Sequence, residues 1–484
     1  MNFSSKAYIP HQPQFISGSK ARSVARLALL VHLCCALQPL FVQAQTNFTV
    51  LKLFQLPDAG VPGGGLAEGK DGGLYGVTAA GGVSNMGTVF VLRSDGSGYR
   101  TLKSFVGTDG MTPWSTLLVS SNGTLFGTTY SGGRSNYGTV FKISPSGTGF
   151  QVLHEFAGGS DGKIPSGALI EGRDGGIYGM TDSGDSTTRG TIYRVNPAGT
   201  GYSVVHAFTG GPDDGQQPKG RLLQTRTGTL FGTATFGGGT KQPGVVFRLE
   251  PDGLYWLPHV FGSAGDGSQP SAGLLQASDG MLYGVTARGG AGTVGTVFKM
   301  DEYGGNYSVL LSFQRIATDA QVPNSELVEG TDGALYGTTA CYGDINSGTV
   351  FRLMKDGSGY AVLHVLATSV SVSDFTTPNG LLAGREGSLF GTIQYGGGGP
   401  DTGGCAYMLS PLPLPPKILS ITLGGGGVSI QSAATSGIYY DLLRSTNLSS
   451  WSVLNTVLSP PNGQLGWTNA GSPEPAAFYR LRQH

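Results

Sequence analysis

A repeat of about 52 residues constrains the fold of this chain more than any other feature of its sequence. A bulky apolar residue followed by an aromatic residue and glycine recurs seven times, with successive aromatic residues 51, 52, 53, 52, 53 and 54 positions apart. These aromatic residues are Tyr75, Phe126, Tyr178, Phe231, Tyr283, Tyr336 and Phe390. A fixed period in this range is typical of repeat architectures, so we interpret the local motifs within the repeat.

Each repeat contains four short segments with strand character. In one repeat they span residues 151–156, 166–171, 176–181 and 190–195. Asp174-Gly175 joins the middle two, and this dipeptide is a strong hairpin signal. Residues 46–410 carry no apolar 3.6-residue period of helix length. Four antiparallel strands per unit and seven units predict an all-β, seven-bladed β-propeller, which we favour over a β-solenoid because solenoid repeats are shorter.

Loop lengths predict the order of the strands in a blade. Tight turns such as residues 95–98 close hairpins within a blade, whereas the longer link from Phe105 to Leu117 crosses to the next blade. The strand with the aromatic–glycine pair is therefore expected second from the axis. Residues 48–54 precede the first full blade, and the last blade, residues 381–409, lacks an outer strand. We expect the N-terminal strand to complete the last blade, because closure removes two open sheet edges.

The composition fits a closed repeat. Of 484 residues, 83 are glycine, and only 12% are charged, with 30 basic and 30 acidic side chains. Hydrophobic residues at 39% provide enough apolar surface for cores, which excludes a disordered chain. A net charge of zero removes the electrostatic basis for binding nucleic acid. We expect the glycine beside each aromatic residue to let the backbones of packed blades approach closely.

The N-terminal residues have the pattern of a signal peptide. Lys20, Arg22 and Arg26 precede an apolar run, residues 27–42, which leads into Val42-Gln43-Ala44, the pattern of a cleavage site after Ala44. We predict a signal peptide in residues 1–44 that is removed on export. The mature chain is then expected to be secreted, periplasmic or at the cell surface, to have no transmembrane span, and to be a monomer.

The propeller is expected to span residues 46–410, with a second module after it. Residues 411–416 form a proline-rich spacer that we interpret as a stiff linker. Residues 417–484 contain about six strand candidates, which predict a small β-sandwich of the immunoglobulin or fibronectin type.

Two strings carry a resemblance to a known family. Leu335-Tyr-Gly-Thr-Thr339 with Gly348-Thr-Val-Phe351, and the matching residues 125–129 with 138–141, resemble the Gloeo/Verruco (GloVer) tandem-repeat family of exported bacterial proteins. The resemblance covers about residues 48–409. It implies a surface or extracellular location and brings no catalytic residues to carry over. The chain departs from the family pattern because it ends in a β-rich module without an anchor helix.

An aspartate four residues before a proline recurs in every repeat. These aspartates are Asp58, Asp109, Asp161, Asp214, Asp266, Asp319 and Asp374. Asp bonds readily to the backbone two residues on, and proline fixes the exit of the chain, so we expect a structural staple between blades. Calcium binding is the alternative, since carboxylates and loop carbonyls suit that ion. One acid per loop supplies little charge, so we predict no metal and no other cofactor.

Four histidines share one repeat position in the outer strand: His154, His206, His259 and His364. A fourth strand lies roughly 20 Å from a propeller axis, too far for equivalent residues to share a metal. We therefore expect exposed histidines without a catalytic role.

Topology predicts one face with the long glycine-rich loops and the Asp-to-Pro links, and an opposite face with the short hairpins. Binding residues gather on loops of a rigid scaffold, and the repeats diverge on this face. The binding candidates are Trp114, Tyr130, Arg134, Tyr137, Phe236, Lys241, Arg288 and Tyr342. Packing of the aromatic rings on their own blades is the alternative. Cys341 and Cys405 fall near this face and allow one disulfide between blades six and seven.

The sequence shows no Ser–His–Asp constellation and no HExxH or CxxC motif. We therefore predict an exported, non-enzymatic scaffold that binds a polysaccharide or a protein through its loop-rich face. A lyase or hydrolase over the central channel is one alternative, and it would need acids, His or Arg clustered at the axis end of several blades. A purely structural surface protein is the other, because a fold alone does not define a function.

Overall fold

The computed structural model describes residues 47–343, 347–366, 377–384, 387–395 and 403–410, and six strands between residues 417 and 483. The predicted signal peptide, residues 1–44, and the predicted linker, residues 411–416, lie outside the described residues. In the part that is described, no helix has the length and hydropathy needed to cross a membrane.

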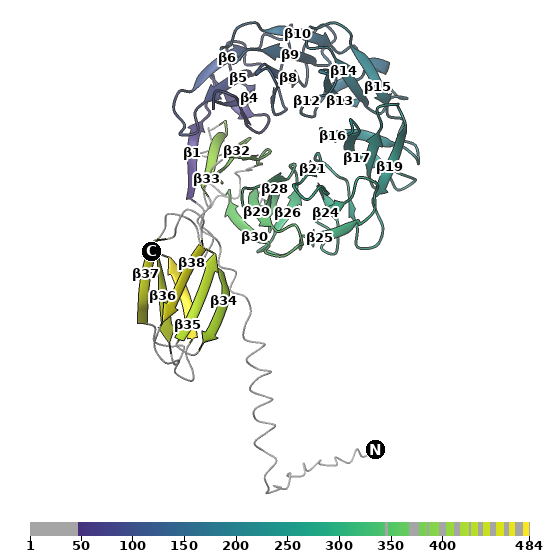
Figure 1. The fold of residues 1–484 in the computed structure, drawn as a ribbon. Coiled ribbons are helices and arrows are strands. Elements are labelled where there is room, and N and C mark those ends of the chain that lie inside the picture. The colour runs from purple at the N-terminus through teal and green to yellow at the C-terminus, as the bar shows by residue number, and fades with distance from the viewer. Residues whose placement is uncertain are drawn as a thin grey trace, which may run out of the picture. The chain divides into compact units, whose positions relative to one another are not determined.

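Small antiparallel sheets make up seven blades between Asn47 and Ser410. The blades follow one another around a ring (Figure 1). We number them as blades 1 to 7. Blade 1 contains β2 (Gly60–Pro62), β3 (Ala67–Glu68), β4 (Leu74–Ala80), β5 (Thr88–Leu92) and β6 (Arg100–Ser104). Blade 2 contains β7 (Leu118–Val119), β8 (Leu125–Thr129), β9 (Thr139–Ile143) and β10 (Gln151–Glu155). Blade 3 contains β11 (Lys163–Pro165), β12 (Ile170–Glu171), β13 (Ile177–Ser183), β14 (Thr191–Val195) and β15 (Ser203–Ala207), preceded by the short 3-10 turn η1 (Gly159–Asp161).

The remaining blades repeat this order. Blade 4 contains β16 (Gly215–Gln224), β17 (Leu230–Gly237), β18 (Val245–Leu249) and β19 (Tyr255–Val260). Blade 5 contains β20 (Gly267–Ser268), β21 (Leu275–Gln276), β22 (Leu282–Thr286), β23 (Arg288–Gly289), β24 (Thr296–Met300) and β25 (Ser308–Ser312). Blade 6 contains β26 (Ala320–Pro323), β27 (Val328–Glu329), β28 (Leu335–Tyr342), β29 (Thr349–Leu353) and β30 (Ala361–Val365). Blade 7 contains β31 (Leu382–Ala383), β32 (Leu389–Ile393), β33 (Cys405–Ser410) and β1 (Asn47–Leu53).

The N-terminal strand closes the ring. β1 pairs with β33, and the register runs from Asn47 opposite Ser410 to Leu53 opposite Cys405. The sheet order β1-β33-β32-β31 places this strand at the outer edge of blade 7. The predicted seven-bladed propeller, with its closing strand and with the aromatic–glycine strand second from the axis, is confirmed.

The innermost strand differs from the prediction of one continuous segment. In blade 3 it consists of two pieces, β11 and β12, which pair with opposite ends of β13. The residue before the proline, Ile164, has a left-handed backbone with φ of 61°, and Pro165 has no N–H to donate to a strand ladder. The ladder is therefore interrupted after Pro165 and resumes at Ile170.

The hydrophobic cores lie between blades. Seven clusters are found among the described residues, and each combines side chains of two neighbouring blades. The cluster that closes the ring, for example, joins Phe54, Leu74 and Phe90 to Phe390 and Ala406 of blade 7. Since both faces of a blade are buried in this way, few positions on the strands are left for charged side chains.

The glycine beside each aromatic residue has a different role from the one predicted. A Cβ on Gly76 would lie 2.4 Å from the ring of Phe90, and one on Gly284 would lie 2.5 Å from the ring of Phe298. These glycines make room for an aromatic ring of the neighbouring strand in the same blade. They do not bring two backbones together.

The C-terminal residues form two three-stranded antiparallel sheets. One has the order β34-β35-β38 and the other has the order β37-β36-β39. The strands are β34 (Lys417–Gly424), β35 (Gly427–Ala433), β36 (Tyr439–Ser445), β37 (Ser452–Leu458), β38 (Gln464–Asn469) and β39 (Phe478–Gln483). That the two sheets pack as a sandwich stays a prediction.

Candidate functional site

The strand order places the long loops and the links at the same end of every blade. Strands alternate in direction, so the loop between the second and third strands and the link to the next blade both leave at one end. The short hairpins leave at the other end. We call these ends the loop-rich face and the hairpin face.

Each link enters the next blade through a residue that is held in the left-handed region. Six such residues precede the repeat proline, with φ between 54° and 61°: Val61, Thr112, Ile164, Gln217, Gln269 and Val322. This conformation is rare for side chains branched at Cβ and persists only where the surroundings enforce it. The N–H of Ile164 donates to the carbonyl of Tyr137 in the preceding blade at 2.9 Å, and Val322 does the same to Val294. The loop-rich face is therefore held by the backbone itself.

The repeat aspartates lie in the seams between blades. Asp266 binds Nε2 of His259 at 3.0 Å, accepts the N–H of Gly267 at 2.7 Å and accepts the hydroxyl of Tyr307 from the next blade. Asp161 and Asp214 also contact a histidine and a tyrosine. Asp109 instead pairs with Lys103 at 2.5 Å, and Asp319 accepts the hydroxyl of Tyr360 at 2.5 Å. Asp58 is exposed, and Asp374 lies outside the described residues.

The backbone partners of these aspartates differ from the prediction. Some of the carboxylates accept an amide that lies three to five residues earlier, as Asp109 does from Val106 and Asp214 does from Thr209. Asp214, Asp266 and Asp319 accept the amide of the residue that directly follows them. Burial alone would raise the pKa of Asp161, Asp214 and Asp266. The hydrogen bonds from histidine, tyrosine and backbone outweigh burial and hold each pKa below the ordinary value of 3.8.

The outer-strand histidines are not the exposed side chains that the sequence predicts. The side chains of His154, His206 and His259 are only 18%, 19% and 16% exposed. Each ring stacks on a tyrosine of the next blade, with centroids 3.6, 4.1 and 3.8 Å apart. These contacts come from a neighbouring blade, so a single repeat unit does not reveal them. The histidines hold blades together.

Blade 2 presents four of the predicted binding residues. Tyr130 and Tyr137 are 43% and 38% exposed, and Arg134 between them has a side chain that is 90% exposed. Trp114 is half-buried, and its Cα packs beside Gly63 of blade 1. The loop is ordered by hydrogen bonds from Tyr130 N–H to the carbonyl of Thr112, and from Gly132 N–H to the side chain of Asn136.

The other binding candidates lie on blades 4, 5 and 6. Phe236 and Tyr342 are half-buried near the ends of β17 and β28, whereas Lys241 and Arg288 are exposed. In the described part of the chain, no hydrogen bond or ring contact joins these four residues to the group on blade 2. The structure thus gathers the candidates on blade 2 and leaves the others spread around the ring.

Sequence reasoning missed a group of charges on the inner strands. Lys219 of β16 lies 2.8 Å from Asp182 of β13, and Arg221 of β16 lies 2.6 Å from Glu326 of blade 6. Arg221 and Glu326 are two blades apart, and only side chains near the centre of the ring can span that interval (Figure 1). We call Asp182, Lys219, Arg221 and Glu326 the axial charge cluster.

Close packing of glycines positions the axial charge cluster. Gly220 has φ of +75°, and a Cβ on it would lie 2.0 Å from the backbone nitrogen of Gly273. A Cβ on Gly167 would lie 1.9 Å from the carbonyl of Gly220. The inner strands of blades 3, 4 and 5 therefore touch backbone to backbone, and Lys219 and Arg221 reach toward different blades. The two cations stand out when the seven repeats are compared at the positions one and three residues after the repeat proline.

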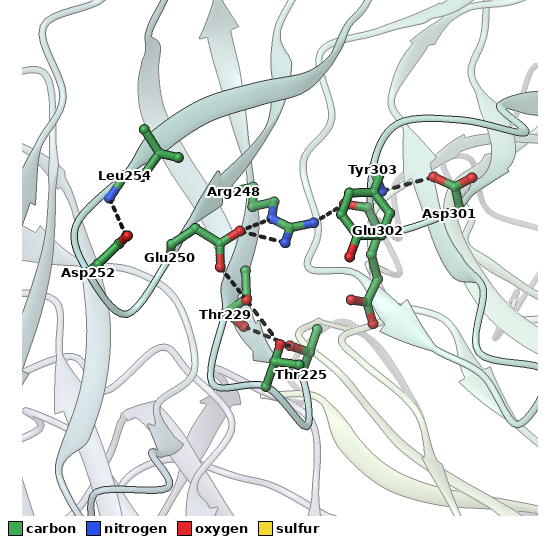
Figure 2. Close-up of polar contacts among 10 residues, drawn as sticks. Thr225, Thr229, Arg248, Glu250, Asp252, Leu254, Asp301, Glu302 and Tyr303 are labelled. Atoms are coloured by element: carbon green, nitrogen blue, oxygen red, sulfur yellow. Dashed lines mark hydrogen bonds and ion pairs between the residues drawn. The ribbon is translucent and has the colours of Figure 1, made fainter.

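The hairpin face carries a different kind of cation. Figure 2 shows Arg248 between the carboxylate of Glu250, at 2.5 Å, and the backbone carbonyl of Glu302, at 2.6 Å. The ring of Tyr303 lies 4.6 Å from the guanidinium, and Thr229 donates to Glu250. The Arg248 side chain is 7% exposed. It joins hairpins of blades 4 and 5 and is closed to a ligand.

The disulfide that the sequence allows is not formed in the structure. Cys341 and Cys405 are free thiols. Cys405 is buried in the third strand of blade 7 opposite Leu53 and Ile393, whereas Cys341 in β28 lies opposite Gln321 of the inner strand. Burial raises the pKa of Cys405 to about 12 and also raises that of Cys341. Among the residues that the structure describes, no three His, Cys, Asp or Glu side chains gather as a metal site.

Seven antiparallel blades in tandem, closed by the first strand, define a repeat-built β-propeller with one loop-rich face. The chain belongs to the Gloeobacter/Verrucomicrobia repeat family, whose model matches residues 40–241 and 226–412. This match confirms the resemblance seen in the repeat strings. The curated proteins contain no match to the chain.

Solved propellers share the fold at low sequence identity. An oligogalacturonate lyase in complex with manganese is 10% identical, with a TM-score of 0.51 over 76% of this chain and 98% of that chain. An ulvan lyase of a new polysaccharide lyase family is 9% identical, with a TM-score of 0.50 over 74% and 96%. A putative 6-phosphogluconolactonase from Bacteroides uniformis is 15% identical, with a TM-score of 0.46 over 68% and 91%. These likenesses show the fold alone.

Proposed function

We propose that this protein is an exported binding protein that holds a polysaccharide on its loop-rich face. The observation that carries the proposal is the pair Tyr130 and Tyr137, exposed on either side of the exposed Arg134. An exposed tyrosine offers a flat apolar ring for a sugar and a hydroxyl for hydrogen bonding.

The order of the blade 2 loop supports this function. Tyr137 is fixed because its carbonyl accepts the N–H of Ile164 from blade 3, and Lys163 lies over its ring at 5.6 Å. Glu155 accepts the N–H of Arg134 at 2.8 Å. Binding to an ordered loop loses less conformational entropy than binding to a loop that must first become ordered. Small Gly, Ser and Asn residues around the rings leave space for sugar hydroxyls.

Export is part of the proposal and rests on the pattern of residues 1–44. N-terminal sequencing of the protein recovered outside the cytoplasm tests it. We expect a mature chain that begins at Gln45. A full-length chain retained in the cytoplasm would contradict export.

Binding assays with variants test the function. We expect Tyr130→Ala and Tyr137→Ala each to weaken the binding of a polysaccharide about tenfold, which corresponds to about 1.4 kcal/mol. Calorimetric titration against a panel of neutral and acidic polysaccharides provides the measurement. Tyr303→Ala is the matched control, because Tyr303 is 71% exposed on the hairpin face. Binding that survives both blade 2 variants, or falls equally in the control, would refute the proposal.

A polysaccharide lyase or hydrolase is the second candidate. The axial charge cluster favours it, since acids and cations of blades 3, 4 and 6 meet at the centre of the ring. The oligogalacturonate lyase and the ulvan lyase, whose names state a polysaccharide substrate, have the same fold. Analysis of polymer length after incubation decides between binding and cleavage. Shortening that disappears in Glu326→Gln would replace the first proposal, and the absence of any ligand would favour a purely structural role.

A further inference from the structure

The two cations of the axial charge cluster have no counterpart at the same positions of the other six repeats. One residue after the repeat proline, the other blades have Gly63, Trp114, Ser166, Ser271, Asn324 and Asn379 where blade 4 has Lys219. Three residues after it, four of them have Gly65, Thr116, Ala168 and Gly273 where blade 4 has Arg221. The ring therefore closes without a cation at these positions. The packing of the blades does not explain why Lys219 and Arg221 are charged.

The two cations are partly accessible. The Arg221 side chain is 47% exposed and the Lys219 side chain is 32% exposed, compared with 7% for Arg248 on the hairpin face. In the described part of the chain, Arg221 donates one side-chain hydrogen bond, to Glu326. A guanidinium has five N–H donors, so most of its donors can still bind a ligand. Arg248, by contrast, contacts both Glu250 and the carbonyl of Glu302.

The charges of the cluster select one kind of anion. Two cations offer donors, while Asp182 and Glu326 offer acceptors, so the cluster is neutral as a whole. A sugar with a carboxylate can bind both the cations and the acids of the cluster. Its carboxylate accepts from Arg221 or Lys219, and its hydroxyls donate to Asp182 and Glu326. A free sulfate or phosphate ion brings acceptors alone, so it leaves Asp182 and Glu326 without donors.

The cluster is continuous with the proposed polysaccharide face. Tyr130 of blade 2 occupies the repeat position of Asp182 in blade 3. Each residue directly follows a buried threonine whose hydroxyl bonds to a threonine of the third strand, Thr129 to Thr139 and Thr181 to Thr191. Blades 2 and 3 therefore present tyrosine and aspartate at the same level of the ring, and Lys219 of blade 4 pairs with that aspartate.

We infer that the axial charge cluster is a subsite for hexuronate units of the bound polysaccharide, whose carboxylates bind Arg221 or Lys219. The inference rests on the proposed function and adds the class of sugar that the face prefers. Asp182 and Glu326 accept the sugar hydroxyls.

The test uses two probes that differ only in charge. One is an oligosaccharide of galacturonate, and the other is the same oligosaccharide with its carboxyl groups reduced to alcohols. We expect the mature wild-type chain to bind the acidic probe at least tenfold more tightly, and the preference to shrink as salt screens the charges. Arg221→Gln and Lys219→Gln should each remove most of the preference while binding the reduced probe as the wild type does.

Arg226→Gln is the matched control, because Arg226 is exposed in the hairpin that follows β16 in the same blade. It should keep the full preference, and thermal melting of each variant shows that it is folded. Equal binding of both probes, or a preference that survives both axial variants, would overturn the inference and leave the proposed function intact. Binding of the acidic probe that depends on Arg221 but not on Tyr130 and Tyr137 would overturn the proposed function and keep the subsite. Binding of neither probe would overturn both.

Discussion

The seams between blades and the inner strand of blade 4 both contain ion pairs, but the two regions use them differently. In the seams, Asp266 is buried together with His259 and Tyr307, and similar partners recur from blade to blade. On the inner strand, Arg221 pairs with Glu326, and this arrangement does not recur in the described part of the ring; both side chains stay partly exposed. Residues that recur in the seams, such as the aspartates, serve the packing of the blades. A residue that occurs in one repeat alone, such as Arg221, is expected to serve another function.

The largest effect is expected where a seam glycine gains a side chain. Gly295 has φ of +111°, and a Cβ on it would lie 2.4 Å from the carbonyl of Thr286 and 2.6 Å from Pro323 of the next blade. Gly295→Ala should lower the free energy of unfolding by about 3 kcal/mol, because strain and a steric clash combine. Gly253→Ala is the control, since Gly253 also has a positive φ, of +91°, but no atom within 4 Å. In denaturant unfolding, Gly253→Ala should lower the free energy of unfolding by about 1 kcal/mol. Equal losses in the free energy of unfolding for the two variants would show that contact between blades is unimportant at Gly295.

The next effect is expected at the seam aspartates. Asp266→Ala removes a carboxylate that binds His259, Tyr307 and the amide of Gly267, and it leaves those buried groups without a partner. We expect a loss of about 2 kcal/mol in the free energy of unfolding. Asp58→Ala changes an exposed aspartate at the same repeat position and should cost less than about 0.5 kcal/mol. If Asp266→Ala and Asp58→Ala unfold at the same denaturant concentration, the buried contacts of Asp266 do not contribute to stability as expected.

The same carboxylates predict how stability depends on pH. The pKa values of Asp161, Asp214 and Asp266 are lower in the folded protein than the ordinary 3.8, so the unfolded chain takes up protons first as the pH falls. Stability should be full above about pH 5 and should decrease as the pH falls through these lowered values. Melting temperatures measured across this range should fall less steeply for Asp266→Asn than for the wild type. An identical slope would show that Asp266 does not contribute.

The smallest effect is expected at the axis. Arg221→Gln breaks a partly exposed ion pair, which contributes no more than about 1 kcal/mol. Its melting curve should nearly coincide with that of the wild type, even though its preference for acidic sugar is lost. A loss of stability as large as that of Asp266→Ala would mean that Arg221 belongs to the framework. The contrast between the two regions would then disappear.

The repeat made the fold predictable. Its period, hairpin turns and missing outer strand were enough to predict seven blades and the pairing of β1 with β33. Features that arise between neighbouring blades were not predictable from one unit. The stacking of His154 on Tyr202 and the contact of Asp266 with Tyr307 each join two blades, and the left-handed backbone of Ile164 is held by Tyr137 of the preceding blade.

The candidate site was predictable only in part. Exposed tyrosines in the blade 2 loop follow from divergence among the long loops. The axial charge cluster was missed because Arg221 and Glu326 are 105 residues apart and meet only when the ring closes. The sequence allowed a disulfide between Cys341 and Cys405 but could not decide it, and both cysteines are free in the structure.

A crystal structure of the mature chain with a bound galacturonate oligosaccharide tests the central claim most directly. The account predicts sugar rings against Tyr130 and Tyr137 on the loop-rich face and a carboxylate within hydrogen-bond distance of Arg221. An oligosaccharide bound to the hairpin face near Tyr303, or to the C-terminal sheets alone, would contradict it.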